Sequence, residues 1–119
     1  MIVVIEPGST AAENFDQVRQ LVQWHHAGLT PAALNVVTVV TGPGRATAKD
    51  LPSTWLVRAE WPWPVLVDDD AGTARSALGI TSTPAILLVD KSGVVRFRAQ
   101  SVIAPKVLAA TIAQDLGVR

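Results

Sequence analysis

The fold is decided by the stretch Ile80-Thr81-Ser82-Thr83-Pro84-Ala85-Ile86-Leu87-Leu88-Val89-Asp90. Its five apolar residues, 85–89, stand between turn-forming residues, and this pattern predicts a strand buried on both faces. Pro84 lacks the amide hydrogen that a strand residue donates to its neighbour, so it fits only at the first position of the strand. We expect the bond between Thr83 and Pro84 to be cis, because cis bonds occur almost only before proline and typically in tight turns.

A hairpin and a helix are expected downstream of this strand. Residues 94–98 form a second strand-like run, and the turn that separates the two runs ends at Gly93. Pro105 suits the first position of a helix. The apolar residues that follow it at helical spacing are Leu108, Ile112 and Leu116.

The N-terminal part of the chain predicts a strand, a helix and a second strand. Residues 2–5 form a β-branched run, and Ser9 or Thr10 is expected to cap a helix, with Glu13 completing a capping box. Gly28 suits the end of that helix, and residues 34–40 form the second strand. The two strands should be parallel and the connection right-handed. The apolar stripe of the helix consists of Phe15, Val18, Leu21 and Val22.

The middle of the chain contains shorter elements. Residues 45–51 predict a short helix that ends before Pro52, and residues 65–67 predict a third strand. The carboxylates of residues 68–70 are expected to cap a helix over residues 71–78; a site for a hard cation is the alternative. Together these elements predict a single three-layer α/β domain over residues 1–119.

Composition excludes several classes of function. The 119 residues are 49% hydrophobic and 17% charged, which is typical of a globular domain. Ten basic and ten acidic residues cancel, so nucleic acid is not an expected partner. No apolar run approaches the ~18 residues of a membrane span. No secretory signal follows Met1, so the cytoplasm is the default expectation, and an extracytoplasmic location is expected if the chain is an excised domain.

The sequence contains no cysteine. Disulfides, thiolate nucleophiles and sulfur-ligated metal sites are therefore excluded. No cofactor and no metal are expected. The two adjacent histidines, His25 and His26, project about 100° apart on a helix and cannot chelate one ion together, so a solvated helix end is the favoured interpretation.

Taken in order, these elements resemble the thioredoxin-like superfamily, and in particular its TlpA-type and redoxin-type branch. The resemblance implies a thioredoxin-like three-layer α/β/α sandwich, with a mixed central sheet, a βαβ unit, and a C-terminal β-hairpin and helix. The segments most similar to that branch are residues 63–69, 78–80, 83–90 and Gly93.

The resemblance also implies where a site would lie. In the family, the first strand ends in a Cys-x-x-Cys loop. Here Ser9 stands at the position of the attacking cysteine and Ala12 at that of the resolving one, so disulfide exchange is not expected. A protein or an extended peptide is the expected partner, bound in a groove between two segments. The residues expected to line it are Pro7, Gly8, Ser9 and Thr10 on one side and Thr83 and Pro84 on the other.

Three functional interpretations are open. The first is a binding or structural module without redox chemistry. The second is an inactive, cysteine-substituted form of a thiol–disulfide oxidoreductase. The third is a transferase that binds a small thiol through Ser9, although such enzymes normally have a further helical domain for which 119 residues leave no room. For Ser9 and Thr10 simple helix capping is the competing interpretation, and for Thr83-Pro84 it is a structural turn.

The tryptophans have two interpretations as well. Trp55, Trp61 and Trp63 lie close together in a sequence that has few other aromatic residues. They can close the edge of a core beside prolines, or they can form an exposed patch for a partner. The first interpretation is favoured.

Overall fold

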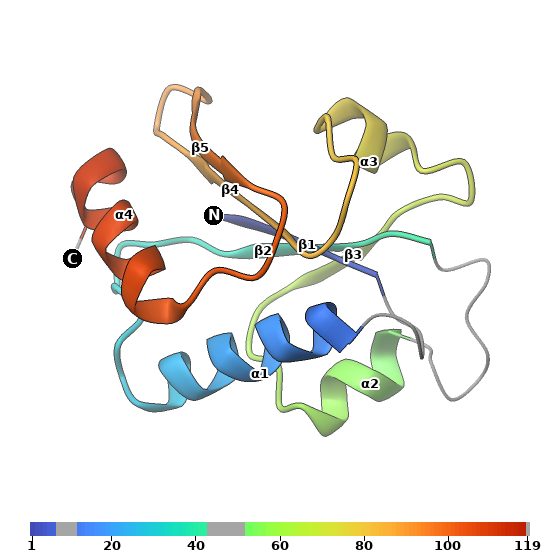
Figure 1. Cartoon of the computed structure of the whole chain (residues 1–119), viewed down its shortest axis with the longest axis horizontal. Coiled ribbons are helices and arrows are strands. Elements are labelled where there is room, and N and C mark those ends of the chain that lie inside the picture. The colour runs from blue at the N-terminus through green and yellow to red at the C-terminus, as the bar shows by residue number, and fades with distance from the viewer. Residues whose placement is uncertain (7–11, 43–51, 119) are drawn as a thin grey trace.

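A mixed sheet of five strands forms the centre of the structure, a computed structural model in which residues 1–6, 12–42 and 52–118 are described (Figure 1). The strands are β1 (Ile2–Ile5), β2 (Val37–Val40), β3 (Val65–Val67), β4 (Ala85–Val89) and β5 (Val95–Ala99). They lie in the order β3-β2-β1-β4-β5. β1, β2 and β3 are parallel, as expected for the βαβ unit, whereas β4 is antiparallel to both β1 and β5.

The central strands are buried on both faces. The residues of β4 from Ala85 to Leu88 are completely buried, as the apolar run predicts, and so are Val3, Val4 and Ile5 of β1. Pro84 is buried immediately before β4, and the Thr83–Pro84 bond is cis. Because side chains alternate between the faces of a strand, each face of this sheet needs its own cover.

Helices supply that cover and make three layers (Figure 1). The helices α1 (Ala12–His26), α2 (Pro52–Arg58) and α4 (Pro105–Leu116) pack on one face, over the larger core, and α3 (Thr73–Ala77) packs on the other face. Leu21 of α1 and Leu108 and Ile112 of α4 are fully buried in the larger core. The predicted α/β class, with its mixed sheet, C-terminal hairpin and closing helix, is confirmed.

A buried amide side chain fastens α1 to the segment before α4. Gln17 is fully buried, and its Nε2 donates to the carbonyl oxygen of Ile103 at 3.1 Å. The amide of Ile103 donates back to Gln17 Oε1 at 2.8 Å. Both polar ends of the side chain are thus paired, as buried amides require.

The structure differs from the sequence-based prediction in where some elements begin and end. The second strand is expected over residues 34–40, but β2 begins only at Val37, because the chain still turns at Pro31, whose carbonyl accepts from the amide of Leu34. The helix α2 is not among the predicted elements: it begins at Pro52, the residue before which the helix over residues 45–51 is expected to end. Proline suits the first position of a helix, where an amide hydrogen has no partner within the helix. The helix predicted over residues 45–51 lies outside the described residues.

One member of the predicted apolar stripe of α1 is not in the core. Val18, Leu21 and Val22 are buried, but Phe15 is 46% exposed. Its ring lies edge-on to Trp55 of α2, with the ring centroids 4.6 Å apart. Phe15 therefore packs between two helices and not on the sheet.

The tryptophans close one edge of the larger core. Trp55 is buried, and Trp61 and Trp63 pack against the same core from partly buried positions. Trp61 Nε1 donates to Thr38 Oγ1 of β2 at 2.8 Å, and the rings of Trp61 and Trp63 meet edge-to-face at 4.8 Å. Their interpretation as the edge of a core is confirmed. His25 also joins this edge, with its ring 5.1 Å from that of Trp63, whereas His26 is exposed as expected.

Candidate functional site

The turn before β4 lies against the end of β1 and the first turn of α1. Thr83 Oγ1 accepts a hydrogen bond from Asn14 Nδ2 of α1 at 3.2 Å and donates to Glu6 Oε2 at 3.4 Å. Glu6 and Ala12 are the described residues on either side of residues 7–11. The structure therefore brings Thr83 beside both flanks of the predicted loop.

The predicted site residues divide into two sets. Thr83 and Pro84 are described: Thr83 is partly exposed and Pro84 is buried. Ala12 is the exposed first residue of α1. Pro7, Gly8, Ser9 and Thr10 lie outside the described residues, as does the helix cap expected at Ser9 or Thr10.

Asn14 joins the three segments of this region. The side chain is only 3% exposed, and its Oδ1 accepts from the backbone amide of Glu6 at 2.9 Å, while its Nδ2 donates to Thr83. Just after the end of β1, the Asn14 side chain therefore accepts the backbone hydrogen bond that a neighbouring strand would otherwise accept. This arrangement fixes the turn relative to the helix.

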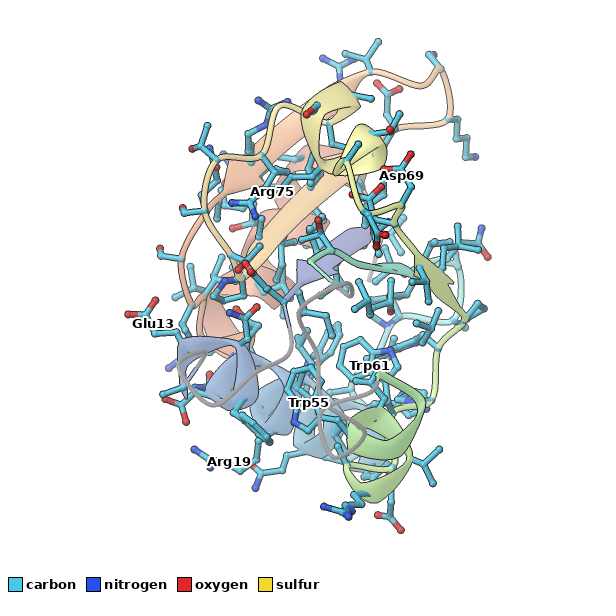
Figure 2. The ribbon with its side chains drawn as sticks, turned by 90° about the vertical axis from the view of Figure 1, so that its right-hand side faces the viewer. Glu13, Arg19, Trp55, Trp61, Asp69 and Arg75 are labelled. Atoms are coloured by element: carbon cyan, nitrogen blue, oxygen red, sulfur yellow. The ribbon has the colours of Figure 1, made fainter. Side chains whose placement is uncertain are left out.

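An ion pair lies beside Asn14. Arg75, which projects from α3 in Figure 2, contacts Glu6 Oε2 through Nη1 at 3.4 Å. The same guanidinium donates to the carbonyls of Ile80 at 3.2 Å and Thr81 at 2.8 Å. Both charged side chains are partly exposed, so the Coulombic part is worth at most about 1 kcal/mol. The guanidinium therefore acts mainly by holding the turn in place.

The side chain of Glu6 also lies against the backbone of Gly42, which follows β2. A Cβ atom at Gly42 would lie 2.9 Å from Glu6 Oε1, and the backbone of Gly42 has φ +74°. The left-handed backbone makes a larger residue strained there, and the Glu6 side chain would also have to shift.

Gln100 holds the exposed side of the turn. Its Oε1 accepts from the amide of Thr81 at 2.7 Å, from the hydroxyl of Thr81 at 3.0 Å and from the amide of Ser82 at 3.1 Å. The hydroxyl of Ser82 donates back to the carbonyl of Gln100 at 2.9 Å. Most polar groups of the turn are therefore occupied within the protein.

Thr83 differs from its neighbours in this respect. Among the described residues, no hydrogen bond uses the backbone amide or carbonyl of Thr83, or the carbonyl of Ser82. A partly exposed residue with free main-chain groups, beside strand β1 and helix α1, can pair with an extended chain.

The carboxylates after β3 form a cap and not an open cation site. Asp68 is 7% exposed, and its oxygens accept from the amides of Ala74 at 2.8 Å and Arg75 at 3.1 Å and from the Thr41 hydroxyl at 3.1 Å. Asp69 accepts from the amide of Thr73 at 2.8 Å. Asp68 and Asp69 satisfy the N-terminal amides of α3, which confirms the predicted cap for these two residues but not for Asp70. The helix itself is shorter than the predicted range of 71–78, since it spans Thr73–Ala77.

The cap sets the charge state of Asp68. Burial acts to raise its pKa, but the hydrogen bonds from the amides of Ala74 and Arg75, the Thr41 hydroxyl and the amide of Asp69 outweigh burial, so the pKa lies below its ordinary value. Asp68 is therefore a buried carboxylate that stays ionised.

The described part of the chain contains neither a cluster of metal-binding side chains nor a helix that could span a membrane. Within residues 1–6, 12–42 and 52–118, no three His, Asp or Glu side chains gather into a group that could hold a metal ion. None of the helices described there is long and apolar enough to cross a bilayer.

The sheet order, the two helical layers and the turn at Pro84 define the class of this protein: it has a thioredoxin-like α/β fold, without cysteine. StoA from Bacillus subtilis has the same fold, with a TM-score of 0.74 over 92% of this chain and 78% of StoA, at 13% sequence identity. A structure described as the thioredoxin-like superfamily protein SPOA0173 has a TM-score of 0.66 over 98% of this chain and 79% of its own, at 22% identity. No protein-family model matches the sequence, and no curated protein is significantly similar to it.

Four residues of this region were not anticipated as a group. Glu6, Asn14, Arg75 and Gln100 come from four separate parts of the chain and meet only at the turn. A signal existed for Asn14, since it shares one face of α1 with the core residues Val18 and Leu21. For the others, the local sequence contains no comparable signal.

Proposed function

We propose that this chain is a thioredoxin-like binding module that holds an extended protein or peptide segment without exchanging disulfides. The partner lies between Pro7, Gly8, Ser9 and Thr10 on one side and Thr83 and Pro84 on the other. Main-chain hydrogen bonds supply most of the affinity, as when a peptide strand pairs with an exposed backbone.

The observation that supports this proposal most is the free main chain of Thr83. Its neighbours in the turn bond to Arg75 and Gln100, whereas the amide and carbonyl of Thr83 have no partner among the described residues. A turn held this firmly loses little entropy when a partner binds, so a few hydrogen bonds suffice.

The absence of cysteine supports the proposal that the module does not exchange disulfides. Disulfide exchange begins with attack by a thiolate. A serine hydroxyl is far too basic to be ionised by a helix N-terminus and needs an adjacent general base. A module that only binds is therefore preferred to an enzyme that exchanges disulfides.

Two substitutions at one position test the proposal. Peptides are selected from a random display library on the immobilised protein, and their affinities are measured for Thr83→Pro and Thr83→Val. Thr83→Pro removes the backbone amide donor, and binding should weaken about tenfold, the effect of losing one hydrogen bond. Thr83→Val keeps the amide and loses the hydroxyl, which bonds to Asn14 and Glu6 within the protein, so binding should weaken less than in Thr83→Pro.

Folding of both variants is checked by thermal unfolding. Equal affinities for Thr83→Pro and Thr83→Val, when both are folded, would contradict recognition through the main chain of the turn.

A further inference from the structure

An apolar groove lies between α1 and α2, and none of its described lining residues belongs to the turn at Thr83. It has a volume of about 330 Å³, and its apolar wall consists of Phe15, Val18, Val22, Trp55 and Ala59. This volume lies at the lower end of the range for sites that hold small molecules.

Phe15 is exposed at this groove. Nearly half of its surface is accessible, and its aromatic ring meets that of Trp55 edge-on at 4.6 Å. Exposing a large aromatic ring to water is unfavourable, and further apolar contact in the groove would remove that cost.

Trp55 lines the same groove and has a buried polar atom. The side chain is 6% exposed, and its Nε1–H has no hydrogen-bond acceptor among the described residues. Buried indole N–H groups normally donate to an acceptor. Because Trp55 forms part of the wall, a ligand that reaches this N–H as it enters the groove would supply the missing acceptor.

The charged residues of the groove are basic. Arg19 and Arg58 line it, and none of the described lining residues is acidic. Figure 2 shows Arg19 beside Trp55. Arg19 pairs with Asp16 at 2.6 Å, one turn earlier on α1, which leaves Arg58 as the lining guanidinium outside that pair. A guanidinium presents a fork of donors that matches a carboxylate.

We propose that the groove binds a small amphipathic carboxylate, with an aliphatic or aryl body of about eight carbons. The body packs on Phe15, Val18 and Trp55. The carboxylate lies at Arg58, and one of its oxygens accepts the Trp55 N–H. This site is independent of the binding proposed at Thr83.

The test is a titration of the ¹⁵N-labelled chain with octanoate, followed through the indole N–H resonance of Trp55. Comparison with Trp55→Phe assigns that resonance among those of the four tryptophans. Octanoate should saturate and move the resonance downfield, whereas octanol, which has the same chain without the charge, should bind at least about threefold more weakly.

A matched pair of variants tests whether the positive charge of Arg58 contributes to binding. Arg58→Gln should weaken the binding of octanoate about three- to tenfold, as expected when an exposed ion pair is lost. Lys106→Gln removes one positive charge from an exposed position on α4 and should leave the affinity unchanged.

Three results would each overturn the proposal: octanol binding as tightly as octanoate, a Trp55 resonance that does not move at saturation, or equal weakening in Arg58→Gln and Lys106→Gln. Because the readout is a resonance of the folded chain, a variant that fails to fold is recognised at once and is replaced by Arg58→Lys, which keeps the charge but not the fork and should bind with intermediate affinity.

Discussion

Asp68 connects the end of one strand to the start of a helix on the other side of a turn. Its carboxylate accepts from two amides of α3 and from Thr41, which follows β2. A buried charge is expensive unless it is fully hydrogen-bonded, and here four donors compensate it. Asp68 therefore stabilises the packing of α3 on the sheet.

Removing this carboxylate should destabilise the protein. Asp68→Ala should lower the free energy of unfolding by about 1–3 kcal/mol, because it leaves the Thr41 hydroxyl and two helix amides without an acceptor. Asp70 is exposed, so Asp70→Ala is the control and should change stability by less than about 0.5 kcal/mol. Urea unfolding at neutral pH measures both, and equal effects of the two variants would contradict the assigned cap.

The same carboxylates should make stability depend on acid pH. The pKa values of Asp68, Asp69 and Asp90 are lowered from 3.8, so the folded state holds these protons more weakly than the unfolded state. For Asp69 the main cause is the hydrogen bond from the Thr73 hydroxyl, and for Asp90 it is the bond from the amide of Val94. Their stabilising effect is complete above the unfolded pKa and is lost as pH falls through the lower, folded pKa.

Urea unfolding at several pH values between about 6 and about 2 checks this prediction. The loss of stability at acid pH should be smaller in Asp68→Asn than in the unchanged chain, because one of the titrating groups has been removed. Parallel curves for the two proteins would show that Asp68 has the same pKa folded and unfolded.

Helices and strands differ in how well the local sequence predicts them. β4 follows from five apolar residues after a proline, and α4 from Pro105 and three apolar residues at helical spacing, because each pattern is local and periodic. α2 is missing from the sequence-based prediction because proline both ends helices and begins them, and the local sequence does not decide between the two. Phe15 was misplaced because periodicity predicts a face of α1 but not whether sheet or helix covers it.

A pair of cysteines tests where the predicted loop lies relative to α1. From the family resemblance, Ser9→Cys combined with Ala12→Cys should form an intramolecular disulfide under mild oxidation, since Ala12 opens α1. In the reduced double variant, the thiol at position 9 should titrate below about 8.5, because a helix N-terminus stabilises the thiolate. Thiol counting before and after oxidation, with the two single variants as controls, measures this. A double variant that keeps both thiols would show that the motif has been aligned to the wrong positions.

The sheet as a unit was more predictable than the site. Five short runs of β-branched and apolar residues, with turn residues between them, suffice to predict a mixed sheet and its helical layers. The polar contacts around the turn depend on residues up to 77 positions apart, such as Glu6 and Thr83, and no local pattern contains them. The position of Thr83 beside β1 and α1 could be expected from the resemblance, whereas the roles of Asn14, Arg75 and Gln100 could not.

The central claim is that an extended chain binds along the turn before β4, and the backbone amide of Thr83 tests it most directly. A peptide selected on the immobilised protein is titrated into the ¹⁵N-labelled chain, and amide shifts and hydrogen exchange are followed residue by residue. We predict that the Thr83 amide moves downfield and exchanges more slowly on binding, because it gains the acceptor that it lacks among the described residues. A saturating peptide that leaves the shift and the exchange rate of the Thr83 amide unchanged would contradict the claim.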